Sequence, residues 1–157
     1  GGPQAAASQY IADLRRDGFE ADLMAKDFEK LLALFGAPMD MSWLSGERLK
    51  GYKVEWSRPG RLRGMVNWYR ASPLQLAQPG SPIPMPDLPL NRLQVPQPHL
   101  LIWGADDSAL LPEATEGLED FAPNLTRITL KGCDHWLHHQ RPDEMSHAIL
   151  TWSEQSV

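Results

Sequence analysis

The chain has 157 residues, of which 42% are hydrophobic and 22% are charged. These values are ordinary for a globular protein, so disorder is not expected. The net charge of -5 excludes the basic surface that nucleic-acid binding requires, and no apolar run reaches the roughly 18 to 20 residues of a membrane-spanning helix.

The only cysteine is Cys133, and the first residues show no basic segment that leads into an apolar core. A single thiol forms no internal disulfide and fits a reducing compartment. We therefore expect a cytoplasmic protein. Because the sequence starts at Gly1 without Met or a capping pattern, we also expect it to be part of a longer chain.

The first 72 residues show helical patterns and no convincing strand. Apolar residues recur at helical spacing, and glycine or proline closes each pattern. The predicted helices cover residues 5–16, 23–36, 46–56 and 61–71. Ser45 is the expected N-cap of the third of them.

A proline-rich segment follows, with eight prolines between Pro73 and Pro98. Proline cannot donate to a backbone ladder, so this segment predicts an extended connector. The pattern then changes to strand (99–103), helix (112–121), strand (125–130) and helix (142–152), which is typical of a parallel sheet with covering helices. Two strands expose both edges and faces, so we expect the end of a larger sheet and a poorly folded isolated chain.

Acidic residues follow the first predicted strand, and a histidine follows the second. Asp106 and Asp107 follow Gly104 and Ala105, and His135 lies 28 residues beyond Asp107. Because the carboxyl ends of parallel strands meet at one edge of a sheet, an acid and a histidine can pair there. The order matches the last two members of a nucleophile, acid, histidine triad of the α/β-hydrolase type. We name Asp107 as the acid and Asp106 as the alternative; either could instead cap the next helix.

Other residues near His135 suggest different chemistry. His138 and His139 would share a helix face with His135, and Asp134 adds an oxygen, as in a metal site. The adjacent glycine disfavours a helix there, and no Cys or Glu stands at ligand spacing, so we expect no metal. Cys133 shares the loop with His135 and is expected to be a small buried residue rather than a nucleophile.

Two tyrosines on separate predicted helices could serve as hydrogen-bond donors in catalysis. The phenols of Tyr10 and Tyr69 can donate hydrogen bonds to an oxygen that gains negative charge when a strained cyclic ether opens. Packing on an amphipathic helix is the alternative role for both. Trp68 and Trp136, next to Tyr69 and His135, are the candidates for an aromatic substrate-binding wall.

With these residues in hand, the chain resembles the C-terminal half of an epoxide hydrolase of the α/β-hydrolase fold. The matching segments are Ser8-Gln9-Tyr10, Gly64 to Ala71, Val95-Pro96, Ile102 to Asp107 and Gly132 to Trp136. The resemblance implies an α/β fold with a helical cap (1–72), a connector (73–98) and the last two parallel strands with their helices (99–157).

The resemblance also implies a hydrolase reaction on a small apolar epoxide, without metal or organic cofactor. An aspartate nucleophile forms an alkyl ester, while two cap tyrosines, here Tyr10 and Tyr69, bind the epoxide oxygen. A histidine, here His135, then activates water against the ester, oriented by the acid Asp107. The product is a vicinal diol.

The chain also departs from the family pattern. The nucleophile turn and the oxyanion loop should precede the cap, and the 157 residues contain no Gly-x-Ser-x-Gly or aspartate elbow. We therefore expect this chain to be inactive without the missing N-terminal half. Leu14-Arg15 stands where the family often has an aromatic residue and an amide. A haloalkane or haloacetate dehalogenase, which the six tryptophans allow, and a non-catalytic binding module are the alternatives.

Overall fold

A computed structural model describes residues 2–36, 38–81 and 89–155. The chain divides into two compact units, Gly1–Ser81 and Pro82–Val157. We call the first the helical unit and the second the sheet unit. In both, the described part contains no helix with the length and apolar character needed to cross a bilayer.

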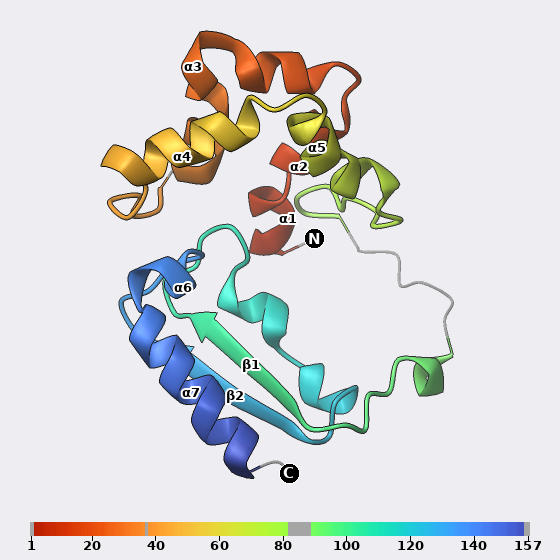
Figure 1. Ribbon diagram of the computed structural model, residues 1–157. Coiled ribbons are helices and arrows are strands. Elements are labelled where there is room, and N and C mark those ends of the chain that lie inside the picture. Colours follow the sequence, from red (N-terminus) through yellow and green to blue (C-terminus); the bar gives the residue numbers. More distant parts are fainter. Residues whose placement is uncertain (1, 37, 82–88, 156–157) are drawn as a thin grey trace. The chain divides into compact units, whose positions relative to one another are not determined.

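The helical unit consists of short and medium-length α-helices (Figure 1). In chain order they are α1 (Pro3–Ala7), α2 (Tyr10–Arg15), α3 (Phe19–Gly36), α4 (Gly46–Trp56) and α5 (Arg61–Ala71). The helix predicted over 61–71 is confirmed. The single helix predicted over 5–16 is wrong, because the chain turns at Ser8 and Gln9, between α1 and α2.

Apolar side chains from α2 to α5 form the core of the helical unit. The buried members are Leu14, Phe19, Leu23, Phe28, Leu31, Leu44, Trp56, Leu62 and Val66. Tyr10 and Tyr69 pack against this cluster while remaining half-buried. The helical periodicity of the sequence therefore predicted the correct inward faces.

Helix α3 contains a break that the apolar pattern does not indicate. Lys26, Asp27 and Phe28 have φ values of 51°, 55° and 68°, in the left-handed region that glycine usually occupies. Neighbours on α4 hold the break in place. Asp27 forms an ion pair with Lys53, and the Phe28 ring packs 5.5 Å from that of Trp56.

Ser45 lies at the N-cap position of α4, but its side chain does not cap the helix. Its hydroxyl donates instead to the carbonyl of Ser42 at 3.1 Å. The sequence therefore predicted the start of α4 correctly and the hydrogen bond incorrectly.

The sheet unit is built on two parallel strands, β1 (His99–Gly104) and β2 (Leu125–Leu130). Their pairing runs from His99 opposite Leu125 to Gly104 opposite Leu130, so both strands end at the same edge. The short helix α6 (Leu137–Gln140) and the helix α7 (Pro142–Gln155) follow β2. Both predicted strands and the final helix are confirmed.

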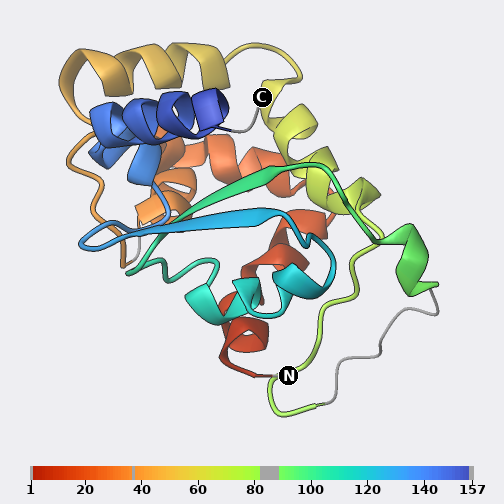
Figure 2. The ribbon, with the colours of Figure 1, turned by 90° about the horizontal axis from the view of Figure 1, so that it is seen from below.

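The two faces of the sheet contact different segments. Figure 2 shows α7 along one face and the segment after β1 along the other. Trp152 of α7 donates to Thr126 at 3.2 Å, whereas the neighbouring Arg127 donates to the Thr115 carbonyl at 2.8 Å on the opposite face. This alternation is the period-two geometry of a strand.

The continuous helix predicted over 112–121 is wrong. The chain instead forms two 3-10 turns, η2 (Pro112–Thr115) and η3 (Leu118–Asp120). Glu116 is extended and Gly117 has a φ of 75°, so the two residues between the turns leave the helical region.

The structure describes both ends of the predicted proline-rich connector. Residues 73–80 contain no helix or strand, and a 3-10 turn, η1 (Leu90–Arg92), precedes β1. The centre of the connector, residues 82–88, lies outside the described residues.

Candidate active site

The loops after β1 and β2 cross at close range. Beyond the strand ends, the Ala105 N–H donates to the Leu130 carbonyl and the Asp106 N–H to the Cys133 carbonyl, both at 2.9 Å. A Cβ at Gly104 would overlap the backbone carbonyl of Cys133, so this crossing requires glycine. The crossing places the residues that follow Gly104 beside the loop that carries His135.

Asp107 and His135 form a hydrogen bond at this crossing. The distance from His135 Nδ1 to Asp107 Oδ2 is 2.9 Å. The other carboxylate oxygen, Oδ1, accepts the backbone N–H groups of Ala109 and Leu110, each at 2.9 Å. Asp107 therefore orients the histidine and also closes its own loop. It does not cap the next helical turn, because η2 has Leu111 at its N-cap position and no side-chain cap. The alternative acid, Asp106, does not make the contact with His135.

Asp107 is far more enclosed than the histidine that it contacts. Its side chain is 3% exposed, and that of His135 is 34% exposed. Because an ionised carboxylate can only accept, His135 Nδ1 carries the proton and donates it, which leaves Nε2 as the basic nitrogen. A histidine held in this tautomer can take a proton from water through Nε2.

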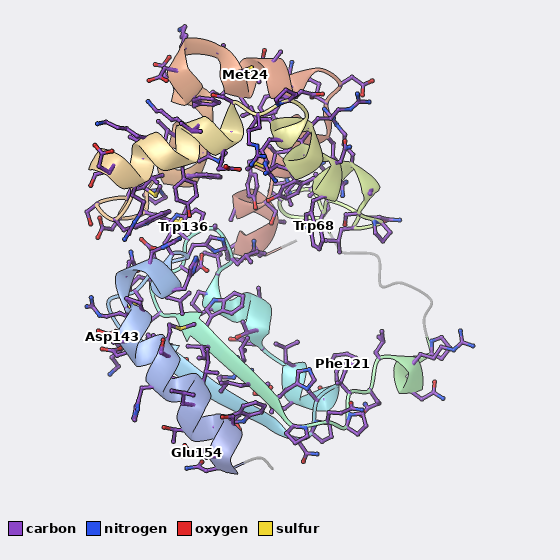
Figure 3. The ribbon with its side chains drawn as sticks, viewed as in Figure 1. Met24, Trp68, Phe121, Trp136, Asp143 and Glu154 are labelled. Carbon is purple, nitrogen blue, oxygen red and sulfur yellow. The ribbon has the colours of Figure 1, made fainter. Side chains whose placement is uncertain are left out.

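The loop that carries His135 is held by its own polar groups. Asp134 is buried, and its Oδ1 accepts the Trp136 backbone N–H at 2.8 Å. The Asp134 N–H donates to the side-chain oxygen of Gln140 at 3.0 Å. The Trp136 ring meets the His135 ring edge to face, with centroids 5.3 Å apart. Trp136, labelled in Figure 3, thus forms an aromatic wall beside the imidazole.

His138 and His139 lie on α6, with ring centroids 4.2 Å apart. Desolvation lowers the pKa of His138, and the nearby charge of His135 lowers this pKa further. Within residues 2–36, 38–81 and 89–155, no three His, Cys, Asp or Glu side chains gather as metal ligands would. Cys133 is buried, and desolvation raises the pKa of its thiol.

In the helical unit, the two predicted tyrosines lie next to each other. Tyr10 begins α2 and Tyr69 lies in the last turn of α5. Their rings meet edge to face, with centroids 6.3 Å apart and an interplanar angle of 76°. The two rings are therefore direct neighbours in the packing of the helical unit.

Trp68 and Tyr69 lie on different faces of α5. Tyr69 shares the inward stripe with Leu62 and Val66. Trp68, which is labelled in Figure 3, has a side chain that is 78% exposed. Trp68 therefore takes no part in the helical core, and a substrate-binding role for it stays a prediction.

Sequence reasoning assigned no role in these sites to two residues that shape them. Gly104 allows the loops to cross, and a glycine at the end of a buried strand was the available signal. Arg15 donates to the carbonyl of Tyr69 at 2.9 Å, a contact between α2 and α5 that no local pattern indicates.

The chain has relatives among known hydrolases. No protein-family model matches the chain. The AB hydrolase superfamily protein YfhM of Bacillus subtilis is 29% identical over 151 residues, covering 96% of this chain and 49% of YfhM. Epoxide hydrolase 4 of Mus musculus is 32% identical over 137 residues, covering 83% of this chain and 35% of that protein.

A solved structure supports the same relationship. An epoxide hydrolase of the α/β-hydrolase superfamily from metagenomes of hot environments is 30% identical, with a TM-score of 0.76, covering 96% of this chain and 51% of that one. The fold and these likenesses identify the chain as a member of the α/β-hydrolase superfamily. Within that superfamily it is an epoxide hydrolase-like chain. It spans about half the length of YfhM and of the metagenomic structure.

Proposed function

We propose that the chain carries the oxygen-binding and water-activating groups of an enzyme that opens small apolar epoxides to vicinal diols. The hydrogen bond of 2.9 Å between His135 Nδ1 and Asp107 Oδ2, at the strand ends of an α/β-hydrolase fold, is the observation that carries the proposal. The edge-to-face pair of Tyr10 and Tyr69 supports the choice of an epoxide.

In the first step of the proposed reaction, a carboxylate from a protein segment outside these 157 residues attacks an epoxide carbon. The carbon–oxygen bond of the ring breaks, and an alkyl ester forms. Tyr10 and Tyr69 donate hydrogen bonds to the oxygen as it becomes an alkoxide, and one phenol supplies its proton. Trp136 and Trp68 are the proposed apolar contacts for the substrate.

In the second step, water hydrolyses the ester. His135 Nε2 takes a proton from the water, and the resulting hydroxide attacks the ester carbonyl. Asp107 stabilises the imidazolium through the Nδ1 hydrogen bond. Collapse of the tetrahedral intermediate releases the diol and restores the nucleophile, and the proton on His135 returns through solvent to the phenolate left by the first step. The difficult ring opening is thus divided into two easier steps.

The proposal assigns residues 1–72 to a cap, 73–98 to a connector and 99–157 to the end of the hydrolase sheet. Because no nucleophile turn occurs in the sequence, we expect the 157-residue chain alone to be inactive. A cytoplasmic location, inferred from the single cysteine, stays a prediction.

A dehalogenase is the second candidate, because the six tryptophans could supply halide-binding N–H groups. It would use the same ester chemistry. The paired phenols favour the epoxide, because a departing halide needs no proton.

The test uses the natural protein that contains this sequence, with His135→Gln and Tyr69→Phe variants. Each is mixed with an aryl epoxide or a haloalkane, and the intact mass of the protein is followed over time. We expect His135→Gln to accumulate an ester adduct of the epoxide, because its formation does not need the histidine. Tyr69→Phe should slow the formation of that adduct.

The outcomes separate the candidates. An adduct formed from the haloalkane and not from the epoxide would support the dehalogenase. Equal rates of ester hydrolysis in His135→Gln and the parent would remove His135 from the mechanism. Absence of an adduct with both substrates would contradict covalent hydrolase chemistry and favour the non-catalytic binding module.

A further inference from the structure

The carboxyl end of α5 needs hydrogen-bond donors from outside the helix. The last carbonyls of an α-helix have no partner within it. After Ala71 the chain becomes extended at Ser72, with a ψ of 129°, so no following turn caps these groups. Tyr69 lies in this last turn, and its backbone position depends on how the helix end is held.

One arginine supplies these donors. Arg15 Nε donates to the Tyr69 carbonyl at 2.9 Å, and its terminal nitrogen donates to the Leu74 carbonyl at 2.7 Å and the Ser72 carbonyl at 3.4 Å. A planar guanidinium can hold several oxygens in fixed directions, and a cation is favourable at a helix carboxyl terminus. Arg15 therefore caps α5 from a different helix.

Arg15 belongs to the same short helix as the other tyrosine. Helix α2 has six residues, from Tyr10 to Arg15. A helix of this length is marginal without tertiary contacts, so its orientation depends on what ties it to its neighbours. At the other end of α2, Gln9 Nε2 donates to the Ala77 carbonyl at 3.0 Å. Two side chains thus fasten α2 to the chain that leaves α5, on either side of Tyr10.

We propose that Arg15 is a positioning residue that sets the spacing of the Tyr10 and Tyr69 phenols, an inference that rests on the proposed role of these tyrosines. It joins the helix of one tyrosine to the backbone of the other. A displacement of about 1 Å at a reacting group can cost roughly 100-fold in rate. Loss of the tether should therefore affect the step in which both phenols meet the epoxide oxygen.

The fold has a second tie that should survive removal of Arg15. Arg70 on α5 forms an ion pair with Glu20 at 2.7 Å and donates to the Arg16 carbonyl at 2.6 Å. The first contact attaches α5 to the start of α3, and the second attaches it to Arg16, the residue that follows α2. An Arg15 variant should therefore keep the helical unit folded, while the Tyr69 carbonyl in the last turn of α5 loses the donor that fixes it to α2.

The test compares Arg15→Met, Arg15→Lys and the control Arg63→Met in the natural protein. Methionine keeps the length and apolar stem of the arginine side chain but cannot donate a hydrogen bond, whereas lysine donates hydrogen bonds from a single nitrogen. Arg63 is an exposed residue of α5. Ester formation and ester hydrolysis are measured in single turnovers. Contacts between the Tyr10 and Tyr69 ring protons are followed by NMR.

We expect Arg15→Met to slow ester formation by roughly 10-fold to 100-fold and to leave hydrolysis within about twofold. Arg15→Lys should recover part of the loss, and Arg63→Met should match the parent. An equal slowing of both steps, or unchanged ester formation, would overturn the inference. If the parent forms no ester, the proposed function fails, and the NMR contacts between the Tyr10 and Tyr69 rings then test the positioning role of Arg15. Persistence of these contacts in Arg15→Met would refute that role, and their loss would support it.

Discussion

Replacement of Asp107 by asparagine separates the charge of this residue from its structural role. The asparagine side-chain oxygen can still accept the N–H groups of Ala109 and Leu110, which Asp107 Oδ1 accepts at 2.9 Å. The side-chain amide nitrogen would then face His135 Nδ1, donor against donor, and the negative charge would be lost. The loop should keep its shape while the imidazole loses its preferred tautomer and its counter-ion.

The size of the effect follows from the geometry of the pair. With Nδ1 and Oδ2 2.9 Å apart, the carboxylate and imidazolium charges are centred about 4 Å apart, which gives roughly 4 kcal/mol at an effective dielectric constant near 20. This stabilisation applies only when the imidazolium has formed, so it lowers the barrier of water attack and not of ester formation. Its loss corresponds to roughly a 1000-fold slower ester hydrolysis.

The assay is a single turnover of the natural protein with an epoxide, in which intact mass reports the ester as it forms and decays. Asp107→Asn should form the ester at the parental rate and retain it for far longer. Asp106→Asn is the matched control, because Asp106 is adjacent but does not contact His135, and it should behave as the parent. A hydrolysis rate within tenfold of the parent in Asp107→Asn, or a large loss in Asp106→Asn, would refute the assignment of the acid.

Other predictions concern stability and titration. Leu23→Ala, at a side chain 1% exposed, should lower the free energy of unfolding by about 2 to 5 kcal/mol, whereas the half-exposed Met24→Ala should change it by less than about 0.5 kcal/mol in the same urea titrations. Because burial and the charge of His135 lower the pKa of His138, its NMR titration should have a midpoint below the usual value of about 6.5. The stability that neutral His138 contributes is present above the unfolded pKa and is lost as the pH falls toward the folded one. Cys133, buried and with a raised pKa, should react with iodoacetamide roughly 100-fold faster in urea than in the native protein, as followed by mass.

The meeting of Asp107 and His135 could be predicted because it depends on strong regularities. Both strands are short apolar runs between loop residues, and parallel strands must end at one edge of their sheet. An acid and a histidine just beyond those ends are therefore neighbours, even though 28 residues separate them. The sequence already favoured Asp107 over Asp106, and Asp107 is the residue whose carboxylate contacts His135.

The failed predictions lie where tertiary contacts override local preference. No glycine or proline marks the left-handed turn at residues 26–28, which is stabilised by the Asp27–Lys53 ion pair and the packing of Phe28 on Trp56. The 112–121 segment carries a helical pattern, yet Arg127 on β2 donates to the carbonyl of Thr115, so that carbonyl is satisfied without a helix. Such contacts join distant parts of the sequence, so they produce no periodic pattern of residues from which they could be predicted.

The two proposed steps of catalysis draw on hydrogen bonds that are internal to separate units. In the helical unit, Arg15 fixes the backbone of Tyr69 relative to the helix of Tyr10. In the sheet unit, the Asp107 carboxylate fixes the ring of His135. Since the phenols act on the epoxide oxygen and the imidazole acts on water, each network bears on one step. Variants of Arg15 should therefore change ester formation alone, variants of Asp107 should change hydrolysis alone, and the two effects should combine additively in a double variant.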